Sequence, residues 1–181
     1  MFGAALLAAL SGGAWAEQKC DPSKPETTPS ARFKVNKQQG IVYDTKTKLT
    51  WKICAEGITY SDGRCTGNAD FKWDYAMKNF DDKANGWRLP NIDELKSIVE
   101  KRCMDPAINL HVFPNTQSSS FWSASAYAGD SDYAYNIYFG RGLVGNDLKV
   151  NSFYVRLVRG VQRSSPLGDL EQKATKTIPA K

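Results

Sequence analysis

Short segments in which apolar and polar residues alternate open the globular part of the chain. Residues 32–35, 40–44 and 49–53 have this pattern, and polar residues typical of turns separate them. Because side chains of a strand point alternately to its two faces, alternation predicts strands with one buried face. We therefore expect three strands of an antiparallel meander.

In two segments in the middle of the chain, the apolar residues have the spacing of a helix. Apolar residues recur every three or four positions in residues 72–83 and again in residues 91–101. The second segment begins with Asn91 and has Glu94 three positions later, which is the spacing of a capping box. Two helices are therefore predicted.

Strand-like residues return in the last third of the chain, at 121–125, 133–139 and 153–158, with glycines between them. We predict that these glycines lie in turns: Gly140, Gly142 and Gly145. The expected architecture is α+β, with antiparallel strands, two helices and an extended loop and hairpin region.

The two ends of the chain differ in composition from its middle. Residues 1–16 contain a short apolar run followed by Ala14 and Ala16, which predicts a cleaved export signal. The first three residues carry no basic side chain, so a start further upstream stays open. We expect a mature protein from about Glu17 with no membrane span, a Pro- and Thr-rich arm at 17–31, a domain at 32–161 and a disordered basic tail at 162–181.

Four cysteines follow the predicted cleavage point, and an even number in an exported chain predicts disulfides with three possible pairings. Cys54 and Cys65 flank a glycine-containing loop that can fold back as a hairpin, so we pair them. Cys20 and Cys103 are then left to join the arm to the body. A zinc site is not expected, because the cysteines lack the paired spacing and the chain has one histidine.

Composition and charge indicate which classes of partner the protein can bind. The 181 residues suit one domain, and 12% of them are aromatic, as in binding surfaces and in small β-rich folds. The net charge of +5 arises entirely after residue 139. Such asymmetry favours acidic partners, and a tail that serves only solubility is the alternative. Nucleic acid is not expected as a partner, because the chain is predicted to be exported and the part before residue 140 is neutral.

An ordered set of short motifs between residues 32 and 161 resembles one known family, the C-terminal domain of the collagen-like bacterial adhesin Lcl. The motifs are residues 44–52, 54–57, 87–99, 105–109, 113–116, 121–125 and 155–160, including Trp87-Arg88-Leu89-Pro90-Asn91 and Phe121-Trp122-Ser123-Ala124-Ser125. The resemblance implies a C-type lectin-like fold, related to formylglycine-generating enzymes. It also implies an exported binding module, since the adhesin's domain is associated with sulfated glycosaminoglycans. Unlike the adhesin, this chain has no collagen-like repeat to supply multivalency.

Enzymatic activity is not expected. His111 is the only histidine and lies between apolar residues, and paired cysteines leave no thiol nucleophile. Formylglycine-generating enzymes depend on reactive cysteines near their ends, whereas no cysteine follows Cys103 here. Asp130 and Asp132 offer carboxylates for calcium, with Asn146 and Asp147 as further ligands, but a polar turn is the default interpretation and we expect no metal or other cofactor.

Two arginines inside the family motifs have structural explanations. Arg88 is flanked by Trp87 and Leu89 at the start of a helix, and Arg156 alternates with apolar residues. We predict that Arg88 forms a structural ion pair rather than a ligand contact, and that Arg156 is structural too.

The strongest candidate binding site is the hairpin region between residues 127 and 154. Tyrosine rings can stack on sugar faces, and amide and cationic groups can bind hydroxyl, carboxylate or sulfate groups. The alternative is that alternation turns about half of these tyrosines inward. The predicted ligand-binding residues are Tyr127, Tyr133, Tyr135, Asn136, Tyr138, Arg141, Asn146, Lys149, Asn151 and Tyr154.

Two hypotheses follow. In the first, the protein is a secreted, periplasmic or cell-surface module that binds an acidic or sulfated glycan, or another cell-surface ligand, through this hairpin face. In the second, the same face binds a protein of a cell-envelope assembly, such as a pilus or a secretion system.

Overall fold

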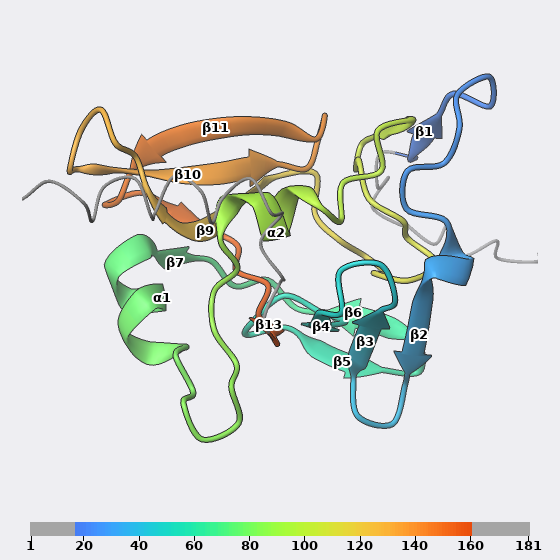
Figure 1. Cartoon of the computed structure of the whole chain (residues 1–181), viewed down its shortest axis with the longest axis horizontal. Helices are drawn as coiled ribbons and strands as arrows, with labels where there is room; N and C mark the ends of the chain where they lie inside the picture. Colours follow the sequence, from blue (N-terminus) through green and yellow to red (C-terminus); the bar gives the residue numbers. More distant parts are fainter. Residues whose placement is uncertain (1–16, 161–181) are drawn as a thin grey trace, which may run out of the picture.

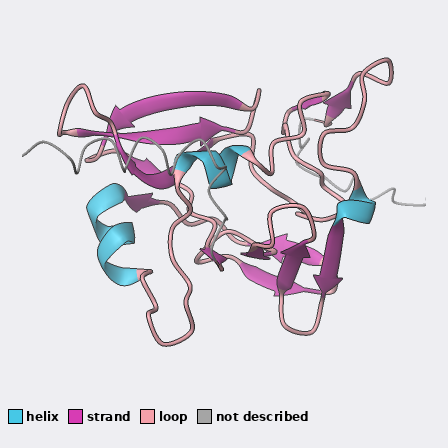
Figure 2. Cartoon of the chain, viewed as in Figure 1, coloured by secondary structure: helices cyan, strands magenta, loops and turns pink. Residues whose placement is uncertain are grey.

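The computed structural model describes residues 17–160 of the chain. The predicted export signal and the whole of the predicted basic tail lie outside the described residues. The fold is α+β, with short antiparallel sheets and two helices (Figures 1 and 2). The specific prediction of a C-type lectin-like fold stays a prediction.

The meander predicted from alternation is confirmed. Strands β2 (Phe33–Asn36), β3 (Ile41–Asp44) and β4 (Thr50–Lys52) pair in sequence order. Strand β13 (Val158–Arg159) completes this sheet by pairing with β4, so the last described residues return to the start of the domain. The N-terminal and C-terminal parts of the domain are thereby held together in one sheet.

The second large sheet has the order β11-β10-β9 and lies at the other end of the molecule (Figure 1). Its strands are β9 (Ser120–Ala126), β10 (Tyr133–Tyr138) and β11 (Leu143–Leu148). Strand β11 was predicted as a turn because of Gly145. The glycine instead lies inside the strand, where a Cβ would come within a tight 3.2 Å of the Oδ1 atom of Asn136 on β10.

Three small pairings complete the strands. They are β1 (Lys19–Cys20) with β8 (Cys103–Met104), β5 (Thr59–Ser61) with β6 (Arg64–Thr66), and β7 (Phe71–Lys72) with β12 (Ser152–Phe153). The single strand predicted at 153–158 is therefore divided. Its first residue pairs with β7 and its last pairs with β4, so the segment crosses between two sheets with Val155, Arg156 and Leu157 buried.

Both predicted helices are present but shorter than the patterns suggested. Helix α1 (Trp73–Asn79) ends before a turn in which Asp82 accepts from the backbone N–H of Asn85. Helix α2 (Ile92–Lys96) begins with the predicted Asn91–Glu94 capping box. The backbone then continues in tighter i→i+3 turns, which keeps Ile98 and Val99 on the buried side after the helix has ended. A short 3₁₀ helix, η1 (Ser30–Arg32), precedes β2.

The two faces of the β9–β11 sheet are covered by different parts of the core. Helix α2 packs on β9 and β10, with Leu95 and Ile98 in one cluster with Phe121 and Ile137. The opposite cluster contains Ala76 of α1 with Trp122 and Ala134. Covering both faces fixes β9 and β10, whereas side chains of β11 such as Leu143, Val144 and Leu148 are left exposed.

The disulfide pairing predicted from the sequence is confirmed. Cys54 bonds to Cys65 across the β5–β6 hairpin, and Cys20 bonds to Cys103 across the β1–β8 pair. The second bridge joins the arm to the body over a sequence separation of 83 residues. Two disulfides fit an extracellular or periplasmic protein.

Candidate functional site

The predicted binding residues lie in several separate places along the hairpin. Tyr127, Tyr133 and Tyr135 form one cluster, in which the ring of Tyr127 lies edge-on to Tyr135 at 5.3 Å and to Tyr133 at 6.5 Å. Asn146 lies directly across from Tyr135 and therefore on the same face of the sheet. We call these four residues the tyrosine end of the hairpin.

Two further predicted residues near the tyrosine end have structural partners. The Nζ atom of Lys149 donates to the backbone oxygen of Ser131 at 2.6 Å and lies 4.4 Å from the centre of the Trp73 ring. Asn151 donates to Asp147 across 2.7 Å. These contacts tie the loop before β10 to the end of β11 and to helix α1.

Two predicted residues serve the packing of the sheet. Asn136 is buried against Gly145. Tyr154 is half-buried, stacks on Phe121 at 5.2 Å and donates its hydroxyl hydrogen to Asn68. The structure does not bring these two side chains to the tyrosine end.

Tyr138 and Arg141 lie at the opposite end of the hairpin, where β10 turns into β11. Tyr133 and Tyr138 are the first and last of the six residues of β10, so five steps along the strand, or about 17 Å, separate them. In Figure 1 the turn points toward β1, whereas the loop between β9 and β10 points away from it. The ten predicted residues therefore do not form one continuous face.

At the β1 side, Arg141 borders an open concavity with a volume of about 730 Å³. The walls come from three distant parts of the chain, namely the arm, the β8 region and the hairpin turn. Five of the lining residues are basic and one is acidic: Lys19, Lys24, Lys101, Arg102 and Arg141 with Asp21. We call this hollow the basic concavity.

Ion pairs account for only part of this positive charge. Asp21 pairs with Lys24 at 3.2 Å, and Arg102 pairs with Glu26. Among residues 17–160, no carboxylate lies within ion-pair distance of Lys19, Lys101 or Arg141. The concavity therefore keeps an excess of positive charge in a shape that concentrates it toward solvent.

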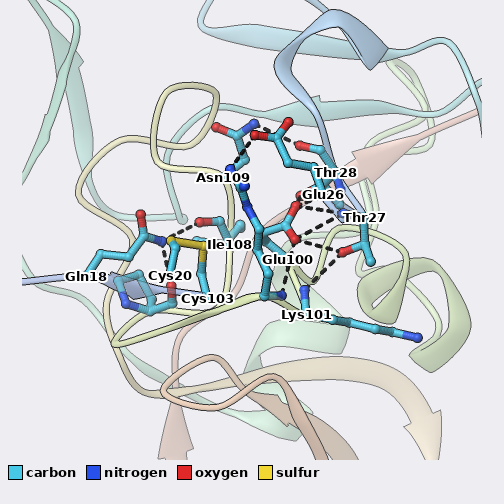
Figure 3. The surroundings of a disulfide bond; sticks show 12 residues. Gln18, Cys20, Glu26, Thr27, Thr28, Glu100, Lys101, Cys103, Ile108 and Asn109 are labelled. Atoms are coloured by element: carbon cyan, nitrogen blue, oxygen red, sulfur yellow. Dashed lines mark hydrogen bonds and ion pairs between the residues drawn. A yellow bond between two sulfur atoms is a disulfide. The ribbon is translucent and has the colours of Figure 1, made fainter. Parts of the chain in front are cut away.

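The arm is fixed in place by the disulfide and by hydrogen bonds around it (Figure 3). The side-chain amide of Gln18 donates to the backbone oxygens of Pro106 and Ile108, both at 2.7 Å. The backbone N–H of Asp21 donates to the oxygen of Arg102 at 2.8 Å. These bonds position Lys19 and Lys24 beside Lys101 and Arg102.

Glu100 is the second anchor of the arm. Its buried carboxylate accepts from the backbone N–H groups of Thr27 and Thr28 and from both hydroxyl groups, at 2.7 to 3.1 Å. Burial alone would raise the pKa of Glu100. The hydrogen bonds from Thr27, Thr28 and Arg102 outweigh burial and hold this pKa below its ordinary value. Glu100 is therefore held as a carboxylate at neutral pH.

Two arginines of the family motifs have the structural partners expected from the sequence. Arg88 forms two hydrogen bonds of 2.7 Å with the carboxylate of Glu94 and another with the oxygen of Gly160. Arg156 is fully buried and donates to the oxygens of Lys52 and Ile53 and to Thr116. Burial lowers the pKa of Arg156 to about 9, and the Glu56 carboxylate acts in the opposite direction. Neither arginine borders the basic concavity.

The remaining candidates lie at the surface. His111 is exposed, and among the described residues its hydrogen bond is made by its backbone N–H, which donates to the side-chain oxygen of Asn109. Asp130 caps a turn by accepting from the N–H of Asp132 at 2.9 Å.

Within residues 17–160 no three potential metal-ligating side chains come together. None of the helices in the same range has the length and apolar character needed to cross a membrane.

Sequence reasoning predicted one of the basic residues of the concavity, Arg141, and missed the others. Lys19 precedes Cys20 directly, and Lys101 and Arg102 stand just before Cys103. The sequence analysis had already predicted that Cys20 pairs with Cys103. This pairing indicates that Lys19, Lys101 and Arg102 lie together beside the disulfide.

Comparison with known proteins gives a match to one family. The model of the Lcl C-terminal domain matches residues 40–159. The arm, with Lys19 and Lys24, precedes the matched residues. Neither the curated proteins nor the solved structures give a match.

Proposed function

Because the chain belongs to the Lcl C-terminal domain family, we propose that it is an exported, adhesin-like binding module whose basic concavity binds acidic or sulfated glycans. This family is not a known enzyme family. The observation that carries the proposal is the convergence of five basic side chains around one concavity, three of them without a carboxylate partner within residues 17–160.

The chemistry of these side chains fits sulfate and carboxylate groups. Arginine can form two parallel hydrogen bonds with such groups, and lysine supplies a mobile point charge. An open concavity suits a polymer, because a sugar chain must enter and leave its site on both sides. Its volume of about 730 Å³ lies within the range of ligand sites.

The tyrosine end adds a second, uncharged surface to this proposal. Tyr127, Tyr133 and Tyr135 are half-buried, so parts of their rings reach solvent. Partly exposed rings can contact the apolar faces of sugars without any charge. We assign the charge-dependent share of binding to the basic concavity and a smaller, salt-insensitive share to the tyrosine end.

Retention on immobilised heparin tests the proposal. The mature protein should be retained at low ionic strength and released as salt screens the charges, because the screening length falls from about 10 Å at 0.1 M to about 3 Å at 1 M. Heparin from which the sulfate groups have been removed is the matched control and should retain the protein weakly. Equal retention on both resins, or none at low salt, would contradict a site for acidic glycans.

A second candidate function rests on the open edge of strand β11. This strand has no second neighbour within residues 17–160, and several apolar side chains on and beside it are exposed. Leu143 is 58% exposed and Val150 is 66% exposed. An envelope protein could add a strand to this edge, with backbone hydrogen bonds supplying affinity. Changing Val144 and Leu148 to Thr should then weaken capture of a defined envelope protein, because the apolar contacts beside the backbone bonds are lost, and leave heparin retention unchanged.

A further inference from the structure

The two disulfides of this protein lie in different surroundings. Cys54 and Cys65 are 7% and 8% exposed and belong to the main core cluster. Cys20 is exposed, and together with Cys103 it borders both the basic concavity and a smaller hollow of about 130 Å³. Cys103 itself is 8% exposed, as Cys65 is, so the difference in accessibility between the two bonds rests on Cys20, which borders both hollows.

The charges around the two bonds differ as well. Lys52 and Glu56, one cation and one acid, border the 220 Å³ hollow beside Cys54. Around Cys20–Cys103 the lining includes Lys19, Lys101 and Arg141, whereas each nearby carboxylate already has a partner. Asp21 binds Lys24, Glu26 binds Arg102, and Glu100 accepts from Thr27 and Thr28.

Positive surroundings act on disulfide exchange in two ways. They stabilise the thiolate that leaves when the bond breaks, and they attract a negatively charged thiolate that attacks. Both effects favour the Cys20–Cys103 bond over the Cys54–Cys65 bond. Accessibility favours the same bond, because exchange requires the attacking sulfur to reach one of the two bonded sulfurs.

We propose that Cys20–Cys103 is an exchangeable disulfide at which anionic thiols form a mixed disulfide, and that this exchange controls the basic concavity. The thiolate of the incoming thiol attacks Sγ of Cys20, because Cys20 is the exposed residue of the pair and Cys103 is buried. A bond forms between the two sulfurs, the Cys20–Cys103 bond breaks, and Cys103 leaves with the electron pair as a thiolate. A second thiolate can then release Cys20 as a thiolate and leave as a disulfide with the first thiol.

Opening this bond alters the concavity because the arm supplies part of its wall. Lys19, Asp21 and Lys24 belong to the arm, whereas Lys101, Arg102 and Arg141 belong to the body. After exchange the arm is held near Cys20 only by noncovalent contacts, such as the hydrogen bonds of Gln18 and Asp21 and the ion pair between Glu26 and Arg102. The attached thiol also occupies the space between the two groups of basic residues. Weaker binding of acidic glycans should follow, and this consequence rests on the proposed function.

Exchange kinetics test the chemical part without any glycan. The mature protein is incubated with glutathione, which is anionic, or with cysteamine, which is cationic, and free thiols are trapped and assigned by mass spectrometry. Cys20–Cys103 should open at least about tenfold faster than Cys54–Cys65 with glutathione. Opening of Cys54–Cys65 first, or at the same rate, would overturn the proposal.

A charge variant makes this test specific. The double change Lys19→Gln and Lys101→Gln should slow exchange at Cys20 with glutathione relative to cysteamine, by about three- to tenfold at low salt. The changes Lys34→Gln and Lys37→Gln on the distant β2 strand and its turn are the matched control and should leave the ratio unchanged. An unchanged ratio in the first variant would show that the basic residues do not drive exchange.

Heparin retention then tests the regulatory part. The mixed disulfide with glutathione, and the variant Cys20→Ser with Cys103→Ser, should both elute at lower salt than the oxidised protein, while circular dichroism confirms that the fold persists. Unchanged elution of a folded, opened protein would overturn control of the concavity. If the oxidised protein itself is not retained, the glycan proposal fails, and the exchange rates still decide whether Cys20–Cys103 is the reactive bond.

Discussion

The two ends of the β10–β11 hairpin are built in different ways. The tyrosine end comes from one stretch of chain, in which Tyr127 directly follows β9 and its ring lies edge-on to the rings of Tyr133 and Tyr135 on β10. The basic end combines Arg141 with residues 19–24 and 101–104, which are distant in sequence. A surface made by one segment can be recognised as a pattern, whereas a surface made by three segments depends on how the chain is folded.

The comparison also separates two kinds of interaction. At the tyrosine end, the rings contact each other, so part of their surface is already used in packing. At the basic end, three cationic groups have no carboxylate partner within residues 17–160 and are free to bind an anion. We therefore expect strong, salt-sensitive binding at one end and weak, salt-insensitive binding at the other.

The largest effect is expected from removing the charges of the basic end. Changing Lys19, Lys101 and Arg141 to Gln should weaken binding to heparin by about 10- to 100-fold at low salt, because three charge-assisted contacts are lost. Titration calorimetry or surface plasmon resonance measures the affinity. Lys34, Lys37 and Lys78 changed to Gln have the same net charge and should keep nearly full affinity. Equal losses in both triple variants would show that overall charge, and not the concavity, binds the glycan.

A smaller effect is expected at the tyrosine end. Changing Tyr127 and Tyr135 to Ala should weaken binding by about three- to tenfold, which is what one or two aromatic contacts contribute. This loss should be the same at low and at moderate salt. Affinities measured at both ionic strengths check it. A loss larger than that of the basic triple variant would reverse the order of the two ends.

The smallest effect on affinity is expected from Glu100, which fixes the arm but does not border the basic concavity. Because hydrogen bonds hold its pKa below the ordinary value near 4.3, its contribution to stability is present above that pH and is lost as the pH falls through its pKa in the folded protein. The arm should therefore loosen only in acid. At neutral pH, Glu100→Gln should imitate this loosening and lower heparin affinity by about twofold.

Hydrogen exchange at the backbone amides of Thr27 and Thr28 is the direct readout of that change. Protection, measured against the intrinsic exchange rate at the same pH, should fall in Glu100→Gln at pH 7, and in the unchanged protein when the pH falls below the ordinary pKa range of a glutamate. The amides of β10 should stay protected in both cases. Protection of Thr27 and Thr28 that does not depend on pH or on this substitution would show that the carboxylate does not hold the arm.

Much of the fold could be predicted because its signals are local. Alternation identified the β2–β3–β4 meander, and the Asn91–Glu94 spacing identified the start of α2. The disulfide pairing followed from the short loop between Cys54 and Cys65. In each case the residues that determine the structure lie within a few positions of one another.

The misassigned parts depend on distant contacts. Gly145 was predicted to lie in a turn, yet it is part of β11 and packs closely against Asn136 on the neighbouring strand. Residues 153–158 were predicted to form one strand. Phe153 instead pairs with β7, whereas Val158 pairs with β4, so the two ends of the segment belong to different sheets. Helix α2 ends early because Val99 and Glu100 pair with the strand-like segment at Ala107 and Ile108 instead. The periodicity of apolar residues along a segment does not show which distant segment it pairs with, so these features could not be predicted from it.

The candidate site, too, could be predicted only where its residues come from one segment of the chain. The tyrosine cluster lies within a segment that composition had already singled out. Among the residues of the basic concavity, only Arg141 belonged to that segment, and Lys19, Lys101 and Arg102 join it through the Cys20–Cys103 bridge. Combining charge with the predicted disulfides would have located this surface before the fold was known.

Chemical-shift mapping with a short heparin oligosaccharide compares the two ends directly. When the ¹⁵N-labelled oxidised protein is titrated at low salt, the largest amide shifts should occur at Lys19, Lys101, Arg102 and Arg141, with small shifts at Tyr127 and Tyr135. The largest shifts at the tyrosine end, or shifts spread evenly over exposed lysines such as Lys34 and Lys78, would contradict binding in the basic concavity.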